Sequence, residues 1–402
     1  MLRYFFKRAL SSLIALFLFV SFMFFVTEIM IPGDFSTQFS EQLSSQQRAE
    51  LQKELGLDVP LEQRYLRWLQ DLLHGSLGMS LYGPPVVDVL GDVLPYTLLV
   101  FFLGTIIAFQ LGQWLGRLVA WPAKFSHPLL ISMRKWLSGG VVWGAVMLYT
   151  TFPPWLAFLV TYFLHRRLML VRDIRRGFQF NEFVRGIWFK ASVTPAMVML
   201  RIVLSFVVIW VLLRWACGFI SHKLRWQPPV WIQVPTFVGL LVGSWYAFGF
   251  GPFALDVMSV AAIPLITYVL LSFGETLLIM RTSMMDTLQE DYITTARAKG
   301  VPESVVRDRH AARTALFPVL SRLIVSLPYM MTGVVIVEDV LGWPGISNAL
   351  FDSLYQQDMA VVMGALLFVG VLSAMARLAL DVLYALLDPR IRYDRGQLRR
   401  AE

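Results

Sequence analysis

The charged side chains best placed to act on another molecule lie in one polar stretch, residues 281–313, between two apolar runs. Residues 287–299 contain neither proline nor glycine, so we expect a helix there. Gly300 suits the left-handed conformation that ends a helix, and Pro302 and Glu303 suit the first turn of a second one. The sequence therefore predicts a helical hairpin on the cytoplasmic side. Such a hairpin is either a solvated loop, which is the commoner case, or an element that binds in the groove of a soluble partner.

No other group of residues points to catalysis or to a metal. The sequence has no Gly-x-x-x-x-Gly-Lys-Ser/Thr loop, no Gly-x-Ser-x-Gly elbow and no His-Glu-x-x-His. The five histidines are scattered, and the single cysteine, Cys217, cannot form an internal disulfide. We therefore expect no catalytic residue, no metal, no cofactor and no ATP hydrolysis by the chain itself.

The composition indicates a membrane protein with several spans. Of the 402 residues, 57% are hydrophobic and 15% are charged, whereas a soluble chain carries about 25% charged residues. This excludes a cytosolic enzyme, a disordered protein and a disulfide-rich scaffold. The net charge of +8 fits the arginine and lysine of cytoplasmic loops, so no nucleic-acid partner is expected.

Eight apolar runs are long enough to cross a bilayer as helices, which need about 20 residues. They cover residues 9–31, 95–119, 139–164, 195–219, 231–250, 257–280, 317–341 and 361–387. These long, unbroken runs predict helices rather than barrel strands. We prefer eight spans, although six remain if the runs at 139 and 231 do not cross.

Charge in the loops orients the chain. Arg3, Lys7 and Arg8 before the first run, and five arginines in residues 389–402, favour cytoplasmic termini. Residues 32–94 carry nine acidic and four basic residues, which suits the outside. If every run before it crosses the membrane, the basic loop after residue 164 lies outside, against the preference of arginine and lysine for the cytoplasmic side.

The outer segment contains an amphipathic helix. Its apolar residues recur at helical spacing and are Tyr65, Leu66, Leu69, Leu72 and Leu73. This face either lies on the membrane surface or packs against the outer part of the protein, and packing is the commoner outcome.

Several motifs resemble those of ABC importer permeases, most closely the dipeptide and oligopeptide (peptide/nickel) branch. The hexapeptide Thr295-Ala296-Arg297-Ala298-Lys299-Gly300 matches the coupling loop of that branch, with Asp291-Tyr292 before it and Arg309-His310 after it. The Trp343-Pro344-Gly345 turn and the ending of the last run also match. The resemblance covers most of the chain except about residues 166–256.

The resemblance implies an all-α polytopic membrane protein with the type I permease fold of ABC importers and an inserted segment. The implied parts are an anchor span (1–31), an extracytoplasmic segment (32–94), core spans (95–164), the insertion (165–256), core spans with the coupling loop 281–316 (257–388), and a basic cytoplasmic tail (389–402). The chain would import di- or oligopeptides across the cytoplasmic membrane of a prokaryote. Its partners would be two ABC ATPase subunits, a sister permease, an extracytoplasmic solute-binding protein and membrane lipid.

The resemblance also implies two groups of site residues. Those that would contact the ATPase are Asp291, Tyr292, Thr294, Thr295, Ala296, Arg297, Ala298, Lys299, Gly300, Arg309 and His310. Those that would face the pore or the binding protein are Trp68, Glu338, Trp343, Pro344 and Gly345. A packing role for the aromatic residues of the second group is an equal alternative.

Other functions stay open. The same branch includes nickel, glutathione and oligosaccharide permeases. An ion-coupled secondary transporter would need charged or discontinuous helices at mid-membrane and often a repeat, and neither is clear in this sequence. An intramembrane enzyme is disfavoured, because no nucleophile and base are paired.

Overall fold

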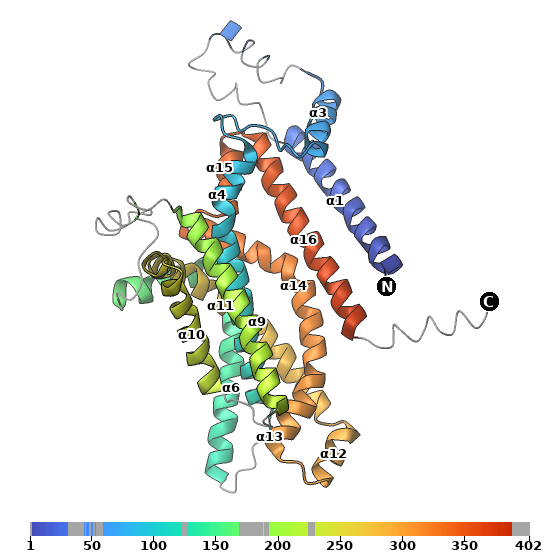
Figure 1. Cartoon of the computed structure of the whole chain (residues 1–402), viewed down its shortest axis with the longest axis vertical. Coiled ribbons are helices and arrows are strands. Elements are labelled where there is room, and N and C mark those ends of the chain that lie inside the picture. Colours follow the sequence, from blue (N-terminus) through green and yellow to red (C-terminus); the bar gives the residue numbers. More distant parts are fainter. Residues whose placement is uncertain are drawn as a thin grey trace, which may run out of the picture. The chain divides into compact units, whose positions relative to one another are not determined.

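The computed structural model describes residues 2–30, 44, 46–47, 50, 53, 59–121, 128–168, 188, 193–223 and 230–387. Across these residues the chain is helical apart from turns and one isolated β-bridge between Met79 and Pro85 (Figure 1). The expected all-α chain is thus confirmed. The predicted tail, residues 389–402, and most of residues 32–58 and 169–192 lie outside the described residues.

The chain divides into two compact units, each described by itself. One unit comprises Met1–Val93, Phe317–Met330 and Ile346–Glu402. The other comprises Leu94–Leu316 and Met331–Gly345. Helix α14 (Ala312–Leu341) contributes residues to both.

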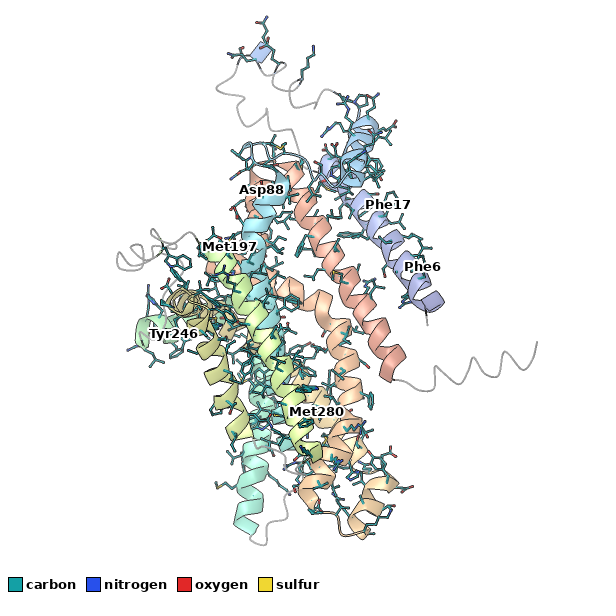
Figure 2. All side chains as sticks on the ribbon, viewed as in Figure 1. Phe6, Phe17, Asp88, Met197, Tyr246 and Met280 are labelled. Carbon is teal, nitrogen blue, oxygen red and sulfur yellow. The ribbon has the colours of Figure 1, made fainter. Side chains whose placement is uncertain are left out.

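In the first unit, α1 (Leu2–Met30) packs against α16 (Met359–Leu387) through Val20, Phe24 and Met363. Phe6 and Phe17 of α1 are exposed instead (Figure 2). Apolar side chains that face outward on a helix of this length suit contact with lipid.

The predicted amphipathic helix is confirmed as α3 (Leu61–Leu73). Its aromatic face packs on α1, where the Tyr65 hydroxyl lies 2.7 Å from that of Ser21 and the Trp68 ring centroid lies 5.5 Å from that of Phe24. Arg64 also forms an ion pair with Glu28 near the end of α1. The packing alternative therefore accounts for the aromatic residues of this helix.

A buried carboxylate joins the outer segment to the start of α16. Asp358, which follows α15 (Ile346–Tyr355), is 2% exposed. Its Oδ2 accepts hydrogen bonds from the Ser80 hydroxyl at 2.6 Å and the Leu81 backbone N–H at 3.1 Å. Burial of a charged group requires such partners, so these bonds fix the loop before α4 onto α16.

The second predicted run begins earlier than expected. One 35-residue helical stretch extends over Val86–Ala120 and is formed by α4 (Val86–Leu98), η2 (Leu99–Leu103) and α5 (Gly104–Ala120). The prediction that this run starts at Pro95 is wrong, since Pro95 lies inside α4. A proline removes one N–H donor from a helix, and the π-helical turn η2 follows it as a local adjustment of the hydrogen bonds.

The third predicted run is broken. Helix α6 (Pro128–Thr150) and the segment formed by α7 (Pro153–Thr161) and η3 (Tyr162–Arg167) meet at an angle of 110°. Pro153 and Pro154 begin α7, and a proline disfavours the helical conformation of the preceding residue, here Phe152. The expectation of one unbroken helix is therefore wrong.

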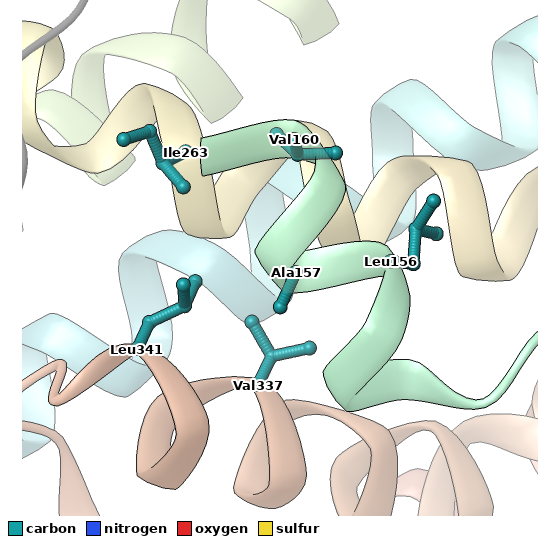
Figure 3. Packing of buried hydrophobic residues seen from close by; sticks show 6 residues of the cluster. All are labelled: Leu156, Ala157, Val160, Ile263, Val337 and Leu341. Carbon is teal, nitrogen blue, oxygen red and sulfur yellow. The ribbon is translucent and has the colours of Figure 1, made fainter. Parts of the chain in front are cut away.

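After the break, α7 enters the core of the second unit. Leu156, Ala157 and Val160 pack with Ile263 of α11 (Gly251–Thr287) and with Val337 and Leu341 of α14 (Figure 3). Helices α9 (Pro195–Lys223) and α10 (Val230–Ala247) belong to the same unit. Trp245 of α10 donates from Nε1 to the Ser205 hydroxyl of α9 at 2.9 Å.

Each of the eight predicted apolar runs overlaps with one or more helices in the described residues. Four helices there are long and apolar enough to cross a membrane, and the number rises to six if each of two bent pairs forms one span. Two shorter apolar helices, Ile232–Ala247 and Met359–Met375, add to these. The choice between six and eight spans stays a prediction.

A stripe of small residues brings α5 against α11. Gly104, Ala108, Gly112 and Gly116 recur every four residues on α5, and Ala108 belongs to a core cluster with Phe273. An added Cβ at Gly112 would lie 2.7 Å from the Phe273 carbonyl oxygen. One at Gly116 would lie 2.7 Å from the Cβ of Met280, which is labelled in Figure 2. Small residues at this spacing let two membrane helices approach closely.

Replacing Gly112 by leucine should drive its side chain into the Phe273 carbonyl and Thr276 of α11. We expect the free energy of unfolding to fall by about 1–3 kcal/mol, the usual cost of overpacking, and the melting temperature in detergent to fall with it. Gly144→Leu on α6 is the matched control, because an added Cβ there meets nothing within 4 Å. Equal melting temperatures for the two variants would refute the packing argument.

Candidate functional site

The polar stretch forms a hairpin at the end of the longest helix. Helix α11 continues past Met280 to Thr287, then a turn leads into α12 (Asp291–Ala298). The helix predicted from Thr287 therefore starts four residues later. The reason is that Glu290, the residue before α12, has an extended backbone with φ −71° and ψ 141°.

The turn after α12 follows the prediction. Gly300 has φ +74°, a left-handed conformation that glycine adopts without steric cost. Its N–H donates to the Arg297 carbonyl at 3.0 Å, and the Val301 N–H donates to the Ala296 carbonyl at 3.2 Å. These two bonds form a Schellman motif, which satisfies the last carbonyl groups of the helix.

The second helix starts directly after this turn. Pro302 precedes α13 (Glu303–Val305) and caps it, instead of lying within its first turn as expected. The chain continues through η5 (Val306–Ala311) into α14. The predicted order of helix, tight turn and helix is confirmed.

The inner face of the hairpin is apolar. Ile293 is fully buried and Ala296 is 8% exposed, and both point into the protein from α12. Val306 and Ala311 of η5 are fully buried as well. Burial of these four side chains fixes the hairpin to its own chain, since apolar surface removed from water stabilises the contact.

Three contacts tie α12 to neighbouring elements. Arg297 lies 3.3 Å from Glu303 of α13, measured from Nε to Oε1, and its guanidinium lies 5.8 Å from the centre of the Trp121 ring after α5. The Tyr292 hydroxyl donates to the Thr314 hydroxyl of α14 at 3.0 Å. Within the hairpin, α12 is thus linked to α13, and the hairpin is linked to the end of α5 and to α14.

The outer side of the hairpin carries most of the predicted ATPase-contact residues. Exposed members of that group are Asp291, Tyr292, Thr294, Thr295, Arg297, Ala298, Lys299, Gly300 and Arg309. His310 is half-buried, and Ala296 faces inward. The small size of Ala296 therefore serves packing inside the chain, whereas Ala298 presents a small side chain outward.

The segment after the turn contains a local ion pair. Arg307 donates from Nε and Nη2 to the two carboxylate oxygens of Asp308, at 2.9 and 2.7 Å. These hydrogen bonds raise the pKa of the Arg307 guanidinium, so this side chain stays charged at any physiological pH.

The residues predicted to face the pore or the binding protein have packing roles within their own units. Trp68 packs on α1, as described above. Glu338 and Trp343 are fully buried, and the Trp343 indole N–H donates to the Tyr96 carbonyl at 3.1 Å. A Cβ added at Gly345 would overlap the Glu338 carboxylate, so a larger residue there would require the Glu338 side chain to move. Pro344 between them is half-buried.

Sequence reasoning missed two anchors of the hairpin, Ile293 and Trp121. Ile293 is the one large aliphatic residue between Asp291 and Gly300, and this isolation was a usable signal. Trp121 lies far away in sequence, so only the fold reveals its contact with Arg297. Within the described residues no group of three metal-ligating side chains gathers.

Two family models match the chain. Residues 115–393 match "Binding-protein-dependent transport system inner membrane component", and residues 1–99 match the N-terminal region of such membrane components. The first match contains the whole hairpin and covers more than half of the chain.

Named relatives match nearly the whole length. The probable peptide ABC transporter permease protein y4tP of Sinorhizobium fredii is 27% identical, over 96% of this chain and 98% of its own. The oligopeptide transport system permease protein AppB of Bacillus subtilis is 26% identical, over 98% of this chain and 100% of its own. The glutathione transport system permease protein GsiC of Escherichia coli is 25% identical, over 98% and 100%. The chain thus belongs to the family of inner membrane components of binding-protein-dependent transport systems, as a multi-pass membrane protein.

Proposed function

We propose that the chain is a permease subunit of an ATP-driven ABC importer that carries di- or oligopeptides across the cytoplasmic membrane of a prokaryote. The single observation that carries this proposal is the α12–α13 hairpin, which presents an exposed polar face at the end of a long membrane helix within the family match. Relatives named for peptide and oligopeptide transport support the cargo class.

The partners follow from the same proposal. Two ATPase subunits lie on the cytoplasmic side and the outer face of α12 contacts the ATPase, a sister permease completes the pore, and a solute-binding protein delivers the cargo from outside. The termini are cytoplasmic, and residues 165–256 form an insertion relative to the core spans. The contact residues on the ATPase side are the exposed members of the predicted group, with Lys299 and Arg309 among their exposed cations.

The geometry supports a mechanical role for the hairpin. Ile293 and Ala296 fix α12 inward, and Arg297 and Tyr292 tie it to α5, α13 and α14. A displacement of α12 by the ATPase is therefore passed to these membrane helices as a rigid-body movement. Alternating access of the pore follows from that movement.

Two alternatives differ in cargo or in energy source. Glutathione is itself a small peptide, and the relative named for glutathione transport favours it among the other cargoes. Permeases for nickel and oligosaccharides belong to the same branch, but none of the relatives described above is named for those cargoes. An ion-coupled transporter would work without an ATPase.

Reconstitution tests the energy source. The chain is purified together with its ATPase and sister permease, inserted into vesicles, and supplied with the binding protein and a labelled dipeptide. We expect uptake that requires ATP and ceases when the ATPase is left out. Uptake by this chain alone, driven by a proton or sodium gradient, would overturn the proposal.

Reversing the charge of Lys299 should uncouple the transporter. Lys299 is exposed, and Lys299→Glu leaves the buried face of α12 intact while placing a like charge against partner carboxylates. We expect peptide-stimulated ATP hydrolysis to fall about tenfold or more, the effect of losing one charge-paired interface contact. Lys135→Glu, an equally exposed charge reversal on α6 outside the hairpin, should keep wild-type activity. The same loss in both variants would argue against a specific contact at Lys299.

Substitutions at Gly300 should show that coupling depends on the left-handed backbone of the turn and not on glycine itself. Gly300→Pro fixes φ near −65° where the chain needs +74°, and it removes the N–H that donates to Arg297. We expect membrane insertion to persist while peptide-stimulated ATP hydrolysis is lost, and Ala296→Glu should do the same by placing a charge on the buried face of α12. Gly300→Asn is the control, because asparagine tolerates left-handed backbone. Normal uptake by the proline variant would contradict the coupling role.

A further inference from the structure

The loop between α3 and α4 is ordered by its own hydrogen bonds. Residues 78–86 close on themselves, because the Ser80 N–H donates to the Pro84 carbonyl at 2.9 Å. The Ser80 hydroxyl donates to the buried carboxylate of Asp358 at 2.6 Å and accepts a bond from the Tyr82 N–H at 3.2 Å. The backbone at the tip of this loop is therefore fixed from within and from α16.

The turn between α15 and α16 meets this loop at the same carboxylate. The Asp358 N–H donates to the Ser353 carbonyl at 2.8 Å, and the N–H of Gln357 donates to the Leu354 carbonyl at 3.2 Å. Gln357 has φ +56°, so these bonds form a Schellman motif at the end of α15. Asp358 Oδ1 also accepts from the Val361 N–H of α16 at 3.4 Å. One side chain thus joins the loop, the end of α15 and the start of α16 within the first unit.

Three large side chains project from this junction. Met79 and Tyr82 of the loop are 60% and 61% exposed, and Tyr355 at the end of α15 is 84% exposed. Val86 and Ile346 of the adjoining helices are buried together in one cluster instead. Tyrosine and methionine are enriched where proteins bind one another, and side chains held on a fixed backbone suit such contacts.

The elements that carry these side chains are acidic. Asp92 of α4, Asp352 of α15 and Asp88, which is labelled in Figure 2, are exposed. Residues 75–93 and 346–358 contain no lysine, arginine or histidine. A complementary partner therefore surrounds an apolar centre with lysine and arginine, because opposite charges at the rim of an interface guide association.

The length of the helical stretch Val86–Ala120 indicates that this surface lies outside the hydrocarbon core. Residues 93–116 carry no charge and extend about 36 Å at about 1.5 Å per residue, whereas the hydrocarbon core is about 30 Å thick. The first turns of α4, with their two aspartates, therefore reach water. At the other end of the stretch Trp121 contacts Arg297 of the hairpin, so the loop is on the side of the membrane opposite the proposed ATPase contact.

We propose that Met79, Tyr82 and Tyr355 form the docking surface for the solute-binding protein of the importer. The inference rests on the proposed function, in which such a protein delivers the cargo, and the matching family is described as binding-protein-dependent. Trp68 and Trp343, the aromatic residues first predicted for this contact, pack within the chain instead. The exposed aspartates favour a soluble protein with a basic surface over the membrane, because anionic headgroups attract basic segments and repel acidic ones.

Binding kinetics on the complete transporter test this surface. The chain is assembled in nanodiscs with its sister permease and ATPase, and association and dissociation of the binding protein are followed by biolayer interferometry. Tyr82→Ser and Tyr355→Ser should each weaken binding about tenfold, mainly through faster dissociation. Tyr82→Phe keeps the ring and should bind nearly as the wild type does. Asp88→Lys should instead slow association about threefold, as expected for a rim charge opposite a basic partner.

Tyr246→Ser is the matched control. Tyr246 is also exposed but lies on α10, in the second unit, and it should bind as the wild type does. Equal loss in Tyr246→Ser and Tyr82→Ser overturns the surface. Faster association of Asp88→Lys would show an acidic partner and overturn the proposal as well. Normal binding by Tyr82→Ser together with poor membrane insertion would show that the ring contacts lipid instead, with the same consequence.

These outcomes can be distinguished from failure of the importer itself. ATP-driven uptake by the wild type, together with wild-type binding by Tyr82→Ser and Tyr355→Ser, would refute the docking surface and leave the proposed function intact. Uptake by the wild type that needs neither ATP nor the binding protein would refute the proposed function, and the docking surface with it.

Discussion

The close contact between α5 and α11 is the constraint on which the second unit depends. Lipid tails are as apolar as a helix surface, so two helices in a bilayer associate through tight van der Waals packing. Gly112 and Gly116 permit that packing, because any side chain there would meet the backbone or a Cβ of α11. Since α11 then continues to Thr287, the helix held in the membrane also carries the hairpin.

The hairpin has a buried inner side and an exposed outer side, which serve different purposes. Its inner side, with Ile293 and Ala296, removes apolar atoms from water and fixes the position of α12. Its outer side leaves Lys299 and Ala298 accessible to another protein. Arg297 belongs to both, because it is exposed yet engaged with Glu303 and Trp121. A force on the outer side of α12 is therefore passed to the rest of the chain, because the buried side chains prevent α12 from shifting by itself.

Local signals in the sequence predicted the local features of the fold. The left-handed turn at Gly300 and a new helix directly after this turn depend on few neighbouring residues, and both were predictable to within one residue. The 110° bend at Pro153 was not predicted, because hydropathy measures composition and not direction. The inward orientation of Ala296 depends on distant residues that bury it, which one helix pattern does not specify. The same reason hid the contact of Trp121 with Arg297.

The size of the outer face limits what the hairpin can do in the proposed transporter. A stable protein interface buries about 800 Å² on each partner, with about 20–30 residues a side. Helix α12 has eight residues, and two of them, Ile293 and Ala296, are buried within the chain. Such a surface is too small to hold an ATPase by itself, so the assembly needs further contacts outside this hairpin. The hairpin instead transmits movement. Because its buried residues fix α12 to the chain, α12 passes on a displacement even when it adds little binding affinity.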